Sequence, residues 1–154
     1  MHLNLEWMEP VILEPGVDAN VSYRVPNIDI IPQMRRGVYI FARRDADDFE
    51  ALYVGRGMLL RRRINQQFNN HNLMAHLQAA RDGDRVLHVG LFRPRRAQQF
   101  RLCLPIIERA LIRHYLGLGH NLLNVHHAQL YAHCIKSGQA NIPPLLSSPI
   151  RVAK

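Results

Sequence analysis

The chain has 154 residues, which is enough for one compact domain with its own core and too few for two. Its hydrophobic fraction of 47% and charged fraction of 21% are those of an ordinary soluble globular protein, and no apolar run approaches the roughly 20 residues of a membrane span. The formal charge of +8, carried mostly by arginine, favours nucleic acid as a partner, because guanidinium groups fork onto phosphate oxygens; a basic solvated surface without a ligand is the alternative.

The N-terminal segment, residues 1–35, is rich in valine, isoleucine and proline. This composition predicts extended segments and turns rather than a helix. We expect the segment to pack beside the core as an N-terminal extension. It lacks the basic start, apolar block and small-residue cleavage site of a secretory signal, so a cytoplasmic location is expected.

The stretch "GVYIFARRDADDFEALYVGRG", residues 37–57, predicts a β-hairpin. Its first strand runs from about Gly37 to Ala42, "ALYVG" forms the second strand, and the polar residues between them form the loop. An antiparallel pair brings Tyr39 and Tyr53 close together. Cross-strand packing alone is one explanation for the two tyrosines, and a shared site is the other.

Helical spacing follows the hairpin. Leu60, Ile64 and Phe68 form one apolar stripe, which predicts a helix that ends at Asn69 and Asn70. A second helix is predicted over residues 73–81, a third strand over 85–92, and the longest helix over 103–119. In the C-terminal segment, residues 127–154, we expect one short helix around 128–135 and then an irregular tail.

Three charged residues on the predicted helices are candidates for contacts with neighbouring elements or ligands. Arg61 and Arg63 flank opposite edges of the first helical stripe, so both are able to reach a neighbouring element. Glu108 lies inside the apolar arc of the longest helix. A carboxylate on a buried face requires a positive partner, either a basic side chain or a metal ion, and the sequence leaves both open.

The order of these elements and residues resembles that of the GIY-YIG nucleases. The resemblance rests on "GVY" ending at Tyr39, "YVG" beginning at Tyr53, Arg63 ten residues further, Glu108 on a later helix, and "LLN" ending at Asn124. It covers residues 36–126.

The resemblance implies an α/β (α+β) fold, with a small three-stranded antiparallel sheet flanked by helices. It also implies a metal-dependent endonuclease that hydrolyses phosphodiester bonds in DNA with one divalent ion, Mg2+ or Mn2+, with RNA as another possible substrate. A nuclease domain of this kind usually depends on a separate targeting element. The short segments on either side suggest weak sequence specificity, a targeting partner or homo-oligomer that supplies specificity, or a compact toxin-like nuclease.

The resemblance also assigns residues. The implied catalytic residues are Tyr39, Tyr53, Arg63, Glu108 and Asn124, with Glu108 as the sole protein ligand of the metal. The predicted nucleic-acid contacts are Arg56, Arg61, Gln67, His71, Arg95 and Arg96.

Two of these assignments have competitors. Gln67 stands where the family often has His or Tyr, and an amide is unable to act as a general base, so His71 is a candidate substitute. Asn121 competes with Asn124, since "HNLLN" offers both asparagines.

Other functions stay open at this stage. One is a noncatalytic DNA- or RNA-binding module that retains the fold, and another is a basic interaction protein. A metal site in "NVHHAQLYAHC" is a weaker possibility, because the spacing of its ligands fits no familiar zinc site and packed or surface histidines explain it better. Its candidate ligands are His126, His127, His133 and Cys134.

Overall fold

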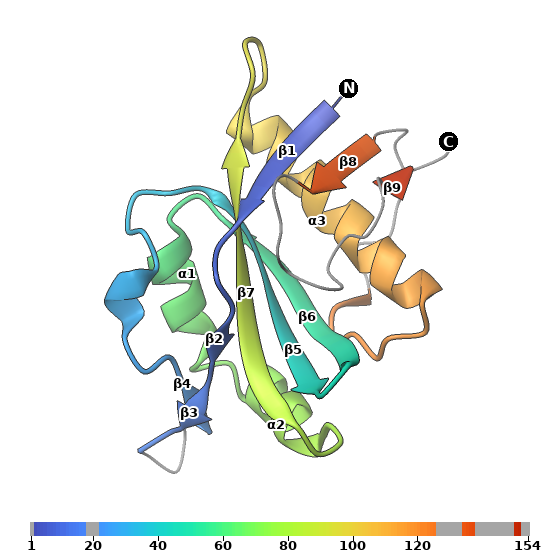
Figure 1. Cartoon of the computed structure of the whole chain (residues 1–154). Helices are drawn as coiled ribbons and strands as arrows, with labels where there is room; N and C mark the ends of the chain where they lie inside the picture. Colours follow the sequence, from blue (N-terminus) through green and yellow to red (C-terminus); the bar gives the residue numbers. More distant parts are fainter. Residues whose placement is uncertain (1, 18–21, 126–133, 138–149, 152–154) are drawn as a thin grey trace.

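The computed structural model describes residues 2–17, 22–125, 134–137 and 150–151. Within these residues the protein is a mixed α/β structure, in which a central β-sheet is packed against three α-helices (Figure 1). None of the helices in this part of the chain is long and apolar enough to cross a membrane.

The three predicted core strands are present and antiparallel. They are β5 (Gly37–Asp45), β6 (Asp48–Gly57) and β7 (Asp84–Arg93), which lie in the order β6-β5-β7. The hairpin strands run further than predicted, because only Ala46 and Asp47 form the turn and Ala46 adopts a left-handed conformation with φ of 47°.

The sheet is larger than the predicted three strands. Among the described residues it has seven strands, in the order β6-β5-β7-β1-β8-β9, with β2 (Val11–Ile12) also beside β7. The first six residues with a described structure form β1 (His2–Trp7), which pairs antiparallel with β7. Its alternate residues Leu3, Leu5 and Trp7 are buried, which is the pattern of a strand with one face on the core. The predicted extension is therefore part of the sheet itself.

The predicted C-terminal helix around residues 128–135 is wrong at its end. Cys134 and Ile135 lie in β8 (Cys134–Ser137), which pairs parallel with β1, and β9 (Ile150–Arg151) pairs with β8. The rest of that prediction lies outside the described residues, as does the histidine cluster before Cys134. Two short elements of the N-terminal segment, β3 (Glu14–Pro15) and β4 (Tyr23–Arg24), form a separate pair, followed by η1 (Ile28–Ile30).

The three predicted helices are present with shifted ends. They are α1 (Leu60–Gln67), α2 (His71–Ala79) and α3 (Phe100–Gly117). The helix α2 begins before its predicted start because Asn70 caps it, its side-chain oxygen accepting a hydrogen bond of 3.2 Å from the Leu73 amide.

The helices cover opposite faces of the sheet. On one face α3 packs against alternate residues of β5, including Val38 and Ile40. On the other face α1, α2 and the N-terminal segment pack against the intervening residues, including Tyr39 and Phe41. A β-bulge in the β5–β6 pairing leaves Leu52 as an extra residue, so Leu52 and Tyr53 both pack on the α1/α2 face.

Strand β6 lies at an edge of the sheet, and residues 120–124 cover that edge. The Ala51 amide donates to Nδ1 of His120 at 2.8 Å, and the Leu123 amide donates to the Leu52 carbonyl at 2.9 Å. We call residues 120–124 the edge clamp. It holds the chain that leaves α3 against the strand that carries the second tyrosine.

Candidate active site

A cleft of about 320 Å³ lies where β6, α1, α3 and the edge clamp meet. Six side chains from five segments line it, although they are up to 85 positions apart in the sequence. They are Tyr39, Tyr53, Arg56, Arg63, Glu108 and Asn124. Five of these are the residues predicted to be catalytic, and the sixth is Arg56, predicted to contact nucleic acid.

The two tyrosines face the same cleft. Their rings stack with centroids 6.2 Å apart and planes 24° from parallel. Tyr39 lies opposite Gly55 in the β5–β6 register, and a Cβ atom on Gly55 would sit 2.4 Å from the Tyr39 hydroxyl. The glycine of "YVG" is therefore required for the Tyr39 ring to lie across β6.

Gln67 holds the two phenols in place from beneath. This side chain is 3% exposed, and its Nε2 donates to the hydroxyl of Tyr39 at 2.9 Å and to that of Tyr53 at 3.4 Å. Its Oε1 in turn accepts from Nδ2 of Asn70 at 3.2 Å. The prediction that Gln67 contacts nucleic acid is wrong, because the side chain is buried and its polar atoms are engaged. Its place one helical turn after Arg63, on the same side of α1, was the available signal.

The environment of Tyr39 keeps its hydroxyl protonated. Burial raises the pKa of Tyr39 well above its ordinary value, and the neighbouring Tyr53 raises it further, while Arg63 and the hydrogen bond from Gln67 lower it in part. Since Gln67 already fills an acceptor position on this oxygen, the phenolic proton is directed elsewhere. Tyr39 is thus a neutral hydrogen-bond donor at neutral pH.

Glu108 has a basic partner. Nε of Arg56 lies 2.8 Å from its Oε2, and the Glu108 side chain is 15% exposed, against 45% for Arg56. Among the described residues nothing engages its other oxygen. Of the two partners that the sequence left open for Glu108, a basic side chain or a metal ion, the free protein has the basic side chain, Arg56.

The donor set fits a magnesium-like ion with a single protein ligand. In the described part of the chain there is no group of three or more His, Cys, Asp or Glu able to enclose a metal. Mg2+ commonly binds through one or two carboxylates and completes its shell with water and substrate phosphate oxygens. The Oε1 of Glu108, in a cleft lined mostly by polar groups, suits that mode of binding.

The two candidate asparagines have different surroundings. The amide of Asn124 bonds the backbone of Val54 in both directions, accepting from its N–H at 3.3 Å and donating to its carbonyl at 2.5 Å. In contrast, the backbone carbonyl of Asn121 is hydrogen-bonded to Nε2 of His76, in α2, at 2.7 Å, and Asn121 lines a different pocket. Asn124 therefore lines the cleft, while Asn121 does not.

Arg61 and Arg63 of α1 point to different parts of the structure. Arg63 is exposed and lines the cleft. Arg61 faces the N-terminal segment, where it donates to the Ile31 carbonyl at 2.6 Å and to the side chain and carbonyl of Asp29 at 2.7 and 2.9 Å. In the free protein the Arg61 guanidinium holds η1 against α1, and its contact with nucleic acid stays a prediction.

The remaining predicted contacts lie outside the cleft. His71 is exposed at the start of α2, and Arg95 and Arg96 are exposed in the loop between β7 and α3. For these three, contact with nucleic acid stays a prediction. Comparison of the chain with family models, with curated proteins and with solved structures gives no match. The geometry of the cleft is therefore the basis for a functional argument.

Proposed function

We propose that the protein is a GIY-YIG-type endonuclease that hydrolyses phosphodiester bonds in DNA and depends on Mg2+ or Mn2+. The observation that supports this proposal is the convergence of the six lining residues in one cleft, from segments far apart in the chain. The charge of +8 supports a polyanionic substrate.

The two arginines bind the scissile phosphate. Arg63 has an exposed guanidinium at the cleft, where it holds nonbridging oxygens as negative charge develops on them. Arg56 is paired with Glu108 in the free protein but is nearly half exposed. Arg56 is therefore placed to contact a phosphate oxygen at the opening of the cleft.

The tyrosines position the water. Tyr39 stays neutral and donates a hydrogen bond to a phosphate oxygen or to the attacking water. Tyr53 is partly exposed whereas Tyr39 is fully buried, so we assign to Tyr53 the role of ordering the water nearest the opening. Gln67 fixes the orientation of both hydroxyls.

Glu108 is the residue that would hold the divalent ion through its carboxylate. When bound, the ion supplies positive charge that stabilises the phosphate and the departing oxygen. Asn124 holds the edge clamp against β6 at the side of the cleft, because its side-chain oxygen and nitrogen both bond the backbone of Val54.

The test is cleavage of plasmid and single-stranded DNA with Mg2+, with Mn2+ and with chelator. Glu108→Gln retains the size of the side chain but removes its charge, so we expect cleavage to fall by at least about 100-fold, the scale observed when one charge-stabilising group is removed. Glu9→Gln is the matched control, because Glu9 is exposed and remote from the cleft, and it should cut like the wild type. Equal cleavage by wild type and Glu108→Gln would overturn the assignment.

A noncatalytic DNA- or RNA-binding module is the second candidate. Two observations favour it: an amide stands beneath the tyrosines instead of a general base, and Arg56 occupies one oxygen of Glu108. Binding of DNA that is retained while no metal supports cleavage would establish this alternative.

A further inference from the structure

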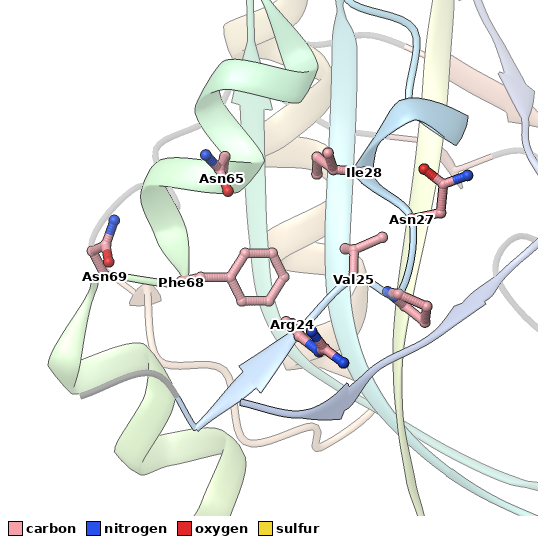
Figure 2. Close-up of a pocket in the computed structure, with 8 residues that line it drawn as sticks. Arg24, Val25, Asn27, Ile28, Asn65, Phe68 and Asn69 are labelled. Atoms are coloured by element: carbon pink, nitrogen blue, oxygen red, sulfur yellow. The ribbon is translucent and has the colours of Figure 1, made fainter. Parts of the chain in front are cut away.

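A second pocket lies on the opposite side of α1 from the cleft. It has a volume of about 400 Å³ and is formed between α1 and the segment that contains β4 and η1 (Figure 2). Its lining residues are Arg24, Val25, Pro26, Asn27, Ile28, Asn65, Phe68 and Asn69. Pockets of this size accept small organic groups.

The pocket combines an apolar interior with amide groups. Figure 2 shows the ring of Phe68 between α1 and the N-terminal segment, with Val25 and Ile28 across from the helix. Phe68 is 5% exposed and its ring is held edge-to-face against Phe41 at 5.6 Å, so it forms a rigid wall. A flat ligand gains apolar contact on such a wall.

Three amide side chains at the pocket have unused hydrogen-bonding groups. Asn65 and Asn69 are exposed, are spaced one helical turn apart, and their side chains bond no other described residue. Asn27 uses its oxygen to cap η1, accepting from the Asp29 amide at 3.0 Å, which leaves its NH2 group as a donor. Amide side chains carry a donor beside an acceptor, the pattern that pairs with the edges of nucleobases.

The charge beside the pocket suits a phosphate. Arg24 pairs with Glu14 at 3.2 Å, with both side chains about half exposed. Such a pair is weak in water, so the guanidinium is available to a phosphate oxygen next to the bound base.

We propose that this pocket binds an unpaired nucleobase of the DNA whose phosphate backbone enters the cleft. The proposal rests on the proposed function, because it takes the same strand as its ligand. Since α1 is about 10–12 Å across and separates the pocket from the cleft, the bound base lies a few nucleotides from the cleft along the strand. The substrate class is thereby narrowed to DNA with a single-stranded region near the cut.

The experiment measures binding in chelator, where nothing is cleaved. Two fluorescent duplexes carry the same single-stranded overhang, long enough to reach the pocket, but one overhang has normal bases and the other has abasic sugars. Phosphate charge is equal in both, so any difference in affinity comes from the bases. We expect the duplex with bases to bind about tenfold more tightly, the scale of a single base contact.

Two double variants locate that difference. Asn65→Ala/Asn69→Ala removes two of the three amides that line the pocket and should abolish most of the tenfold difference between the two duplexes. Gln66→Ala/Asn72→Ala removes two exposed helical amides that do not line the pocket, and should retain the tenfold preference. Thermal unfolding verifies that both variants are folded, which is expected because all four side chains are exposed.

The outcomes separate this proposal from the proposed function. Metal-dependent cleavage without any preference for the overhang with bases overturns the pocket and leaves the nuclease intact. A base preference that Asn65→Ala/Asn69→Ala removes, in a protein that never cuts, supports the pocket and overturns the nuclease. A preference that survives in this variant, or no binding of either duplex, overturns the pocket.

Discussion

Two buried polar side chains on opposite faces of the sheet show different solutions to the same physical problem. Gln67, on the α1/α2 face, is 3% exposed and bonds both phenols of the cleft and Asn70. His88, on the α3 face, is 1% exposed, and neither of its ring nitrogens has a partner among the described residues. A buried polar group stabilises a fold when it is satisfied and costs free energy when it is not. The two tyrosines of the cleft lie on the face where the buried polar group is satisfied.

The surroundings of His88 explain its charge state. The ring packs edge-on against Phe49 at 5.5 Å. Burial lowers the pKa of His88 to about 4 from its ordinary value of 6.5, and Arg44 contributes to the same direction. His88 is therefore neutral in the folded protein at neutral pH.

The largest effect expected from the difference between His88 and Gln67 is a loss of folding stability at low pH, caused by His88. Above pH 6.5 the side chain is neutral whether the chain is folded or unfolded. As the pH falls from 6.5 to about 4, His88 binds a proton in the unfolded chain but stays neutral in the folded chain. The free energy of unfolding therefore decreases. At about 1.36 kcal/mol per pH unit the loss reaches roughly 3 kcal/mol. Urea unfolding at a series of pH values measures it.

The variant His88→Leu isolates this contribution. It removes the titrating group and both unpaired nitrogens, so it should flatten that part of the pH profile and raise stability at pH 7 by about 1 kcal/mol. His114 and His120 also have a lowered pKa because of burial, and their share of the acid effect should persist. An unchanged slope in the variant would contradict the role given to His88.

A substitution of the same kind on the other face should have the opposite sign. Gln67→Met conserves volume but leaves the Tyr39 hydroxyl and the Asn70 amide without their partner. We expect a loss of about 2 kcal/mol in the free energy of unfolding, within the roughly 1–3 kcal/mol of a buried unsatisfied group. Urea unfolding at pH 7 measures it beside His88→Leu. If both variants are stabilised, satisfaction of hydrogen bonds does not distinguish the two faces.

The smallest effect concerns the attachment of the N-terminal segment to the α1/α2 face. Arg61→Ala removes the bonds to Asp29 and Ile31, which are partly exposed, so we expect a loss of about 1 kcal/mol. Arg62→Ala is the matched control, because Arg62 is exposed and bonds no other described residue. Equal stability of the two variants would mean that Arg61 contributes nothing to this attachment.

Local patterns predicted the elements that form the cleft. The spacing of Leu60, Ile64 and Phe68 defined α1, and the alternation around Tyr39 and Tyr53 defined the hairpin. These signals are short-range, so a single sequence is enough to read them. The gathering of the predicted catalytic residues followed from the resemblance, which linked elements that no local pattern connects.

The same short-range patterns do not predict which strands pair across the sheet. The residues of β1 alternate as a strand should, but their partner is β7, with Asn4 opposite Arg93, and nothing local encodes that register. Arg61 and Arg63 looked equivalent because each flanks the stripe of α1. Only the position of Asp29 on a separate element made one of them structural.

The edge clamp has a consequence for how the molecule behaves in a crowded solution. An uncovered edge strand is a template for another chain, and the standard defences are short strands, charges or a covering segment. On β6 the cover includes the amide of Asn124, which imitates a peptide group opposite Val54. The asparagine that lines the cleft therefore helps to make this edge unavailable to a neighbouring strand, so its replacement should favour self-association.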